Sequence, residues 1–177
     1  MLTDDHIVLR APEPDDVHTL YRWENDPEVW RVSGSAQPYS LHTLMKYVDS
    51  INDVYTDHQM RLMIADASSS KLYGAIDLFD CDFRHRRAGV GIMIGDVQDR
   101  GEGIGSRALA LLLDYAFGTL GFHQLYCQVQ VDNLPSLRLF EKFGFVHVGV
   151  KKDWSFADGV FRDEVFLQKI NKKAGEE

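Results

Sequence analysis

A glycine-rich segment in the middle of the chain carries the strongest chemical signal. It reads Arg100-Gly101-Glu102-Gly103-Ile104-Gly105-Ser106, just before an amphipathic stretch. Alternating glycines let the backbone turn tightly, so that several N–H groups point the same way. A helix beginning there adds the positive end of its dipole, and together these features suit a pyrophosphate. The spacing fits neither a Walker loop nor the Rossmann fingerprint, so the alternative is a turn without a ligand.

A second segment, about thirty residues downstream, combines a helix start with polar and aromatic residues. It reads Asn133-Leu134-Pro135-Ser136-Leu137-Arg138-Leu139-Phe140-Glu141-Lys142-Phe143-Gly144-Phe145. Asn133 is a good N-cap, Pro135 suits a first helical turn, and Gly144 suits the position just beyond a helix. The segment therefore predicts a short helix that begins at Asn133.

The periodicity of apolar residues predicts the elements that position these two segments. Strands are expected at 7–11, 60–65, 72–79, 88–94, 125–131, 145–150 and 160–169. Helices are expected at 14–24, 41–55 and 104–116, besides the short one that begins at Asn133. This order predicts a single α+β (mixed α/β) domain over residues 1–170, with helices on the faces of a mixed sheet. Residues 171–177 form a short polar tail.

The charge of the chain disfavours some partners. Lysine and arginine number 19 against 27 acidic residues, a net charge of −8. Such a surface repels phosphate backbones, which argues against nucleic acid, and attracts cations such as amines. Solubility alone is an alternative reason for the acidity.

Composition excludes further classes. The chain has 177 residues, 45% of them hydrophobic, which suits one soluble domain. No apolar run approaches the ~20 residues of a membrane span, and the charged start is unlike a signal peptide. We therefore expect a cytoplasmic protein without a membrane partner. Cys81 and Cys127 stand apart from each other and from any CxxC spacing, so no metal is expected.

Together, the two segments resemble the signatures of the GNAT superfamily of acyl-CoA-dependent N-acyltransferases. The pyrophosphate loop of that family, Arg/Gln-x-x-Gly-x-Gly/Ala, is matched by Arg100, Gly103 and Gly105. Its second signature is matched by Asn133, Ser136, Phe140, Lys142, Gly144 and Phe145. Within the superfamily, the chain is similar to bacterial spermidine N-acetyltransferases and to relatives that acetylate the N-termini of ribosomal proteins. The shared features are Leu9-Arg10, His85-Arg86-Arg87-Ala88, Asp114-Tyr115-x-Phe117 and Leu125-Tyr126.

The resemblance implies a mostly antiparallel sheet in which strand 88–94 splays from strand 125–131. The pantetheine arm of acetyl-CoA would then pair with Ile92, Met93 and Ile94. The amides of residues 101–106 would hold the pyrophosphate. The matched residues of the second signature would complete the cofactor site, with Asn133 near the thioester.

Three departures from the family concern the chemistry. Many relatives carry a tyrosine that reprotonates the leaving thiolate where this chain has Phe140. The polyamine enzymes have a glutamate where this chain has Gly89, and an acidic pair where it has Ala36 and Gln37. The first two departures weaken a simple acid–base assignment, and the third weakens polyamine binding in that loop.

Other residues are candidates for the missing roles, because an ammonium must lose a proton before it attacks a thioester. Asp77 and Asp80 lie in or just after strand 72–79, where the polyamine enzymes also have acids. Asp82 is a weaker candidate, since a solvated hairpin end explains it. His85 is a further candidate, with an exposed charge run shared with Arg86 and Arg87 as the alternative. Tyr126 is a third possible catalytic residue, although it alternates with Cys127 along its strand and so can instead face the core.

We therefore expect an acetyl-CoA-dependent transferase that acetylates a primary amine, with a polyamine such as spermidine as first choice. The alternatives are acetylation of a protein N-terminus and a catalytically weak acyl-CoA-binding module. Family resemblance also suggests a homo-oligomer.

Overall fold

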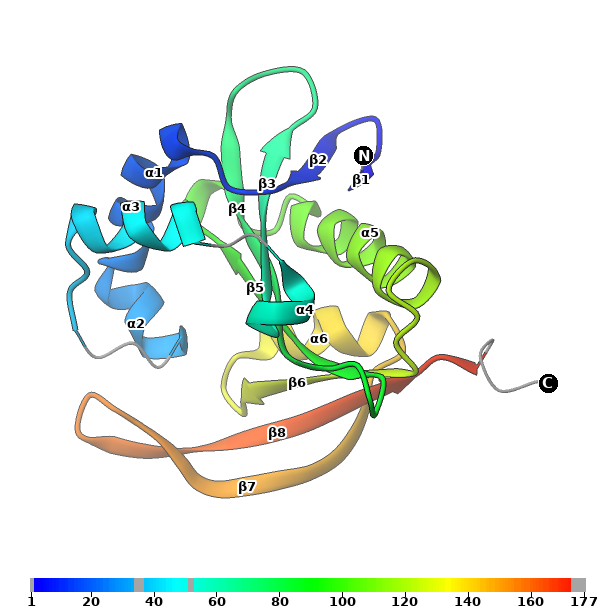
Figure 1. Ribbon diagram of the computed structural model, residues 1–177. Helices are drawn as coiled ribbons and strands as arrows, with labels where there is room; N and C mark the ends of the chain where they lie inside the picture. The colour runs from blue at the N-terminus through cyan, green and yellow to red at the C-terminus, as the bar shows by residue number, and fades with distance from the viewer. Residues whose placement is uncertain (1, 34–36, 51–52, 173–177) are drawn as a thin grey trace.

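The computed structural model describes residues 2–33, 37–50 and 53–172. One eight-stranded sheet has the order β1-β2-β3-β4-β5-β6-β8-β7 (Figure 1). Its strands are β1 (Leu2–Thr3), β2 (Ile7–Arg10), β3 (Met60–Asp66), β4 (Leu72–Asp82), β5 (Arg87–Ile94), β6 (Gln124–Gln130), β7 (Val146–Ala157) and β8 (Val160–Ile170). Neighbouring strands are antiparallel except β5 and β6, which are parallel. The predicted mixed, mostly antiparallel sheet is confirmed.

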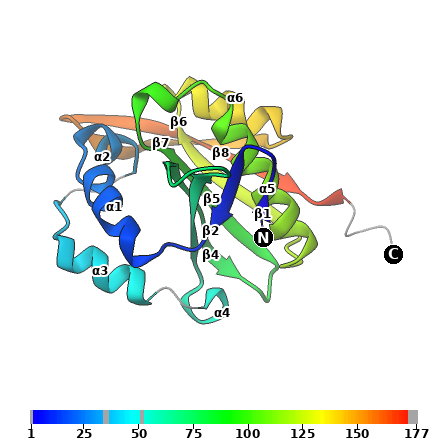
Figure 2. The same cartoon turned by 90° about the horizontal axis from the view of Figure 1, so that it is seen from above.

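Helices cover both faces of the sheet, as predicted (Figure 2). They are η1 (Pro14–Asp16), α1 (Val17–Glu24), α2 (Pro27–Ser33), α3 (Leu41–Ser50), α4 (Val54–Asp57), η2 (Val97–Asp99), α5 (Ile104–Gly118) and α6 (Leu134–Lys142). Alternation along the strands sends Ile64 and Ile76 into a core shared with α5 and α6, and Met63 and Ala75 into one shared with α1 and α3. Among the described helices, none is both long and apolar enough to cross a membrane.

Several predicted boundaries were wrong, for local reasons. In place of the one helix expected at 41–55 there are two helices, α3, which ends at Ser50, and α4. The break is stabilised by Asp53, whose side chain caps α4 by accepting from the Tyr55 amide. The strand expected at 72–79 continues to Asp82 through a bulge, where Asp80 takes a φ of 47°. The final hairpin is also longer than the ranges 145–150 and 160–169, and β1 and α2 were not predicted.

The predicted splay of two strands is confirmed by the register of β5 and β6. Their ladder has the pairs Arg87–Gln124, Ala88–Leu125 and Gly89–Tyr126. Both strands continue past the last pair, β5 to Ile94 and β6 to Gln130. On its other side β5 stays paired with β4 as far as Ile94. The sheet therefore opens between β5 and β6 just beyond Gly89, and one side of β5 keeps its backbone groups available there.

A partly buried ion pair ties β2 to the helical segment that begins α1. Arg10 at the end of β2 donates two hydrogen bonds to Asp16, at 2.7 and 2.8 Å. The Glu13 amide donates a third to the same carboxylate. Burial alone would raise the pKa of Asp16, but these hydrogen bonds outweigh it and hold the pKa below its ordinary value. The pair therefore fixes where α1 begins relative to the sheet.

We expect Asp16→Asn to lower the free energy of unfolding by about 2–3 kcal/mol, below the ~3–5 kcal/mol of a fully buried pair because Arg10 is partly exposed. The stabilisation from a carboxylate with a depressed pKa is present above the ordinary aspartate pKa of ~3.9 and is lost as the pH falls through the folded value. Denaturant unfolding at pH 7 and in acid would show the difference from wild type shrinking below about pH 4. Asp15→Asn, one residue away and exposed, serves as the control. An equal effect of both variants would contradict this role.

Candidate active site

The glycine-rich loop of residues 100–106 runs from η2 into the first turn of α5. Gly101 and Gly103 have φ values of 85° and 81°, in the left-handed region that glycine tolerates best. Gly103 is the N-cap of α5, and no side chain in the described ranges caps the helix there. Residues 100–103 are exposed, while Ile104 is buried and anchors the turn. The first amides of α5 are thus available to an anion from solvent.

The second sequence segment packs beside this loop. Asn133 is the N-cap of α6, as predicted, and its side chain accepts from the Ser136 amide at 3.3 Å. Lys142, in the last turn of α6, donates to the Ser106 hydroxyl at 3.5 Å. The structure therefore brings together the two segments that the sequence analysis singled out.

The end of β5 lies between the loop and the core. Ile92 faces the α5 side, where its Cδ1 lies 3.6 Å from a Cβ built on Gly105. Met93 points the opposite way, against the core of α1 and α3. Ile94 is partly buried, and its carbonyl accepts from Arg100 at 3.3 Å. The Arg100 side chain thus folds back onto the strand that precedes the loop.

The other face of the sheet, on the side of α1 and α3, carries the predicted acids. Asp77 on β4 accepts two hydrogen bonds from Arg61 on β3, at 2.8 and 2.9 Å. A third donor of Arg61 reaches Glu24 at the end of α1, at 2.5 Å. Burial alone would lower the pKa of Arg61, but Asp77 and Glu24 outweigh it and raise the pKa, so that Arg61 stays charged. Asp77 is therefore held in an ion pair, and the three side chains together carry a net charge of about −1 at neutral pH.

Phe79 occupies the place of the missing glutamate. Gly89 pairs with Phe79 across β4 and β5, and a Cβ built on Gly89 would overlap the Phe79 ring. A side chain at position 89 and this ring placement exclude each other. The ring of Tyr126 lies edge-on to Phe79, with centroids 5.9 Å apart. An aromatic surface thus covers the point where β5 and β6 part.

Asp80 and Tyr126, predicted separately, are in contact. The Tyr126 hydroxyl donates to Asp80 at 3.2 Å. Burial, the Asp80 charge and this hydrogen bond raise the pKa of Tyr126 to about 12. The phenol is therefore protonated at neutral pH and available as a hydrogen-bond donor to Asp80. Asp80 is exposed, so an incoming cation can reach it.

Phe140 packs into the core under α6 and is only 3% exposed. Its ring lies edge-on to Phe145, with centroids 5.1 Å apart. Asp82, a weaker candidate, accepts from the His85 amide and from Arg87 in the β4–β5 turn, as the hairpin-end interpretation expects. Ala36 lies outside the described residues.

Sequence reasoning missed Arg61 and Phe79. Both act through strand pairing, since Arg61 stands opposite Asp77 and Phe79 opposite Gly89. The one available signal was the absence of a side chain at Gly89.

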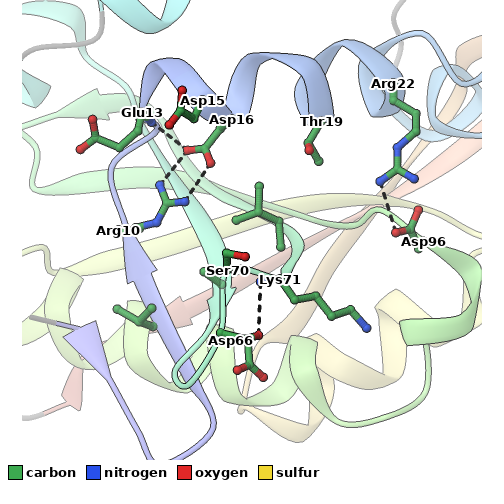
Figure 3. A pocket seen from close by; sticks show the side chains of 14 residues that line it. Arg10, Glu13, Asp15, Asp16, Thr19, Arg22, Asp66, Ser70, Lys71 and Asp96 are labelled. Carbon is green, nitrogen blue, oxygen red and sulfur yellow. Dashed lines mark hydrogen bonds and ion pairs between the residues drawn. The ribbon is translucent and has the colours of Figure 1, made fainter.

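Two cavities lie on the side of the β3–β4 turn. One, of about 610 Å³, lies between that turn and α1 (Figure 3). Its charges include the ion pairs Arg10–Asp16 and Arg22–Asp96, and no residue of the loop or of the Asp80–Tyr126 pair lines it. The second, of about 450 Å³, borders the loop at Glu102 and Ile104 and is also lined by Arg107. In the described part of the chain, no group of three or more His, Cys, Asp or Glu side chains is arranged to hold a metal ion.

Comparison with known proteins agrees with this geometry. Residues 6–146 match the acetyltransferase (GNAT) domain family. A spermidine N(1)-acetyltransferase from Vibrio cholerae is 26% identical over 90% of both chains. An uncharacterized N-acetyltransferase, p20 from Bacillus licheniformis, is 26% identical over 97% of this chain and 96% of its own. The crystal structure of spermidine N-acetyltransferase from Vibrio cholerae in complex with CoA and spermine superimposes with a TM-score of 0.86 at 25% identity, covering 97% of this chain and 99% of that one.

The chain belongs to the GNAT acetyltransferase family. It is an N-acetyltransferase that uses acetyl-CoA as its cosubstrate.

We expect Gly103→Val to lower the affinity for acetyl-CoA about tenfold, a loss of ~1.4 kcal/mol. The added side chain would stand at the exposed N-cap of α5, where an anion needs bare backbone. Isothermal titration calorimetry would measure the loss.

The control for backbone strain is Gly159→Val in the β7–β8 turn. Gly159 has a φ of 77°, and, as at Gly103, a Cβ would meet nothing within 4 Å. Both variants should lose similar thermal stability, since each forces a β-branched residue into the left-handed region. Unchanged acetyl-CoA affinity in Gly103→Val would move the pyrophosphate site elsewhere.

Proposed function

We propose that this enzyme transfers the acetyl group of acetyl-CoA to a primary amine of a polyamine such as spermidine. The observation that carries the proposal is the opening between β5 and β6, which has the glycine-rich loop at one end and the Asp80–Tyr126 pair where the strands part. The similar enzymes from Vibrio cholerae, one of them described with CoA and spermine, support the choice of acceptor.

The cosubstrate would lie along the unpaired side of β5. Its pantetheine arm would pair with the backbone at Ile92, Met93 and Ile94, and its pyrophosphate would accept from the amides of residues 101–106. Arg100 stiffens this path by bonding the carbonyls of Ile94 and Gly95. The remaining predicted contacts are Asn133, Ser136, Phe140 and Lys142, which belong to the helix packed on the loop.

The Asp80 carboxylate would accept the proton that the substrate ammonium must lose, directly or through water. The free amine then attacks the thioester carbonyl, so that a C–N bond forms and the C–S bond breaks. The leaving thiol has a pKa near that of cysteine, ~8.5, and can depart as a thiolate. A phenol with a pKa of about 12 gives its proton to that thiolate unfavourably. Tyr126 would therefore position Asp80, and the departing thiolate would take the second proton of the attacking nitrogen, directly or through water, as the amide forms.

Asp77 would act on the acceptor at longer range. Its two oxygens are engaged by Arg61, so it is poorly suited to take a proton. Together, Asp77, Glu24 and Arg61 carry a net negative charge, which favours a cationic acceptor near the opening.

Homo-oligomerisation also belongs to the proposal. β7 is the last strand of the sheet, and its side chains Val146, Val148 and Val150 are exposed. An apolar edge strand of this kind favours pairing with another chain. The cytoplasmic location stays a prediction.

The acceptor is tested by acetyl-CoA turnover with spermidine and with a basic peptide bearing a free N-terminus. We expect faster turnover of spermidine, and rates that fall as salt screens charges beyond ~10 Å at 0.1 M. Asp80→Asn should lower kcat/KM for spermidine about 10²-fold at pH 7, and less at pH 9, where more of the amine is already deprotonated.

Asp82→Asn is the matched control, because it removes the same charge two residues away. Faster turnover of the peptide than of spermidine would indicate that the acceptor is a protein N-terminus and not a polyamine. Absence of turnover with either acceptor would refute both acceptor classes and leave the amine substrate of this acetyltransferase to be sought elsewhere.

Two further variants test which group donates a proton to the leaving thiolate. Tyr126→Phe should lower kcat only modestly, because it removes one hydrogen bond to Asp80 and leaves the carboxyl group itself in the site. Phe140→Tyr should raise kcat by much less than the ~10²–10⁴-fold of full general acid catalysis, provided that its hydroxyl reaches the opening. Thermal unfolding of Phe140→Tyr checks this, since a buried unpaired hydroxyl costs about 1–3 kcal/mol. A nearly inactive Tyr126→Phe beside an unimproved Phe140→Tyr would make Tyr126 the general acid.

A further inference from the structure

The ammonium of Lys151, on β7, is held against the sheet face that carries the candidate active site. Its Nζ lies 4.3 Å from the centroid of the Trp154 ring and 5.6 Å from that of Phe166. It also donates a hydrogen bond to the side-chain oxygen of Gln128 on β6. Lys151 thus reaches across β8 to the strand that borders the opening.

This group of side chains continues the aromatic surface at the opening. Phe79 lies edge-on to Tyr126, and Tyr126 stacks on Phe166 with centroids 5.3 Å apart. Phe166 pairs with Gln128 in the β6–β8 ladder, two residues beyond the last pair of β5 and β6. These side chains form a row from the point where β5 and β6 separate to Lys151. The two ends of the row are about one to two strand spacings, or ~5–10 Å, apart.

The chemistry of these partners selects an alkylammonium. Two aromatic faces attract a cation through their quadrupoles, and an amide oxygen accepts one of its N–H bonds. A carboxylate would gain neither interaction, and a neutral donor would gain only the hydrogen bond. The Trp154 side chain is 59% exposed, so a ligand from solvent can reach the same ring.

We propose that Gln128, Trp154 and Phe166 form a subsite for the distal ammonium of a di- or polyamine acceptor, and that Lys151 occupies this subsite as an intramolecular competitor. The proposal rests on the proposed function, because the acceptor's other amine must sit at the opening. An acceptor with two ammonium groups displaces Lys151, whereas a monoamine leaves it in place. Lys151 would thereby set the affinity for polyamines without touching the reacting atoms.

The size of the effect follows from the exposed position. A cation–π contact at an exposed site contributes about 0.5–1 kcal/mol, which corresponds to a two- to fivefold change in affinity. A tethered side chain also competes at a local concentration in the ~mM range. Removing the Lys151 ammonium should therefore lower the KM for a diamine measurably.

The kinetic experiment compares Lys151→Met with wild type on 1,6-diaminohexane and n-hexylamine. We expect Lys151→Met to lower the KM of the diamine about two- to fivefold, with kcat and the KM of the monoamine unchanged. Lys152→Met is the matched control, because it removes the neighbouring charge, whose ammonium is paired with Asp163. Adding Trp154→Leu to Lys151→Met should reverse the gain. An unchanged diamine KM in Lys151→Met, or an equal gain in Lys152→Met, would overturn the subsite.

A binding measurement separates this inference from the proposed function. Titration of 1,6-diaminohexane without acetyl-CoA should quench tryptophan fluorescence in Lys151→Met, more weakly in wild type, and not when Trp154→Phe is added. Quenching of this pattern without turnover of spermidine or of the diamine would support the subsite and refute the proposed acetylation of polyamines. Normal turnover without such quenching would refute the subsite alone.

Discussion

Among the described strands, the one parallel pairing, between β5 and β6, is the constraint on which the site depends. Parallel strands need a crossover connection, and here α5 returns the chain from the end of β5 to the start of β6. The crossover places the N-terminus of α5 beside the end of β5. Because the pairing stops at Gly89–Tyr126, the available edge of β5 and the amides of the loop belong to one continuous surface. A longer parallel ladder would close that surface.

The acidic side chains on the sheet face covered by α1 and α3 differ in function because their hydrogen-bond partners differ. Asp77 and Glu24 share Arg61, whereas the hydrogen-bond partner of Asp80 is the Tyr126 hydroxyl. A guanidinium occupies both oxygens of a carboxylate through charge-assisted hydrogen bonds, while a single phenol hydroxyl donates to one of them. The bulge in β4 brings Asp80 to Tyr126 instead of into the regular alternation of the strand. Of the predicted acids, Asp80 is thus the one suited to accept a proton.

Local sequence signals were sufficient to predict the conformation of the glycine-rich loop, the N-cap of α6 and most helices and strands, since glycine spacing and an N-cap act within a few residues. The splay came from family resemblance, not from periodicity. Contacts set by strand register could not be predicted from local sequence: Arg61 meets Asp77, Phe79 covers Gly89 and Lys151 reaches Gln128 only once the six strands from β3 to β7 in the sheet are paired. The helix expected through Tyr55 failed because Asp53 starts a new helix at α4, a competing local signal within one apolar pattern.

Gly89 and Lys151 bear on the same question of how the enzyme selects a cation. Gly89 has no side chain, and the Phe79 ring fills the space where one would lie. A cation at that point would therefore be attracted by aromatic ring faces and not by the formal charge of a carboxylate. Ring faces attract ammonium groups more weakly than carboxylates do, and a weak site is one that a tethered lysine can occupy. The net charge of −8 attracts cations toward the molecule over longer distances. Long-range attraction and short-range competition can therefore be altered independently, the first by surface acids and the second by Lys151.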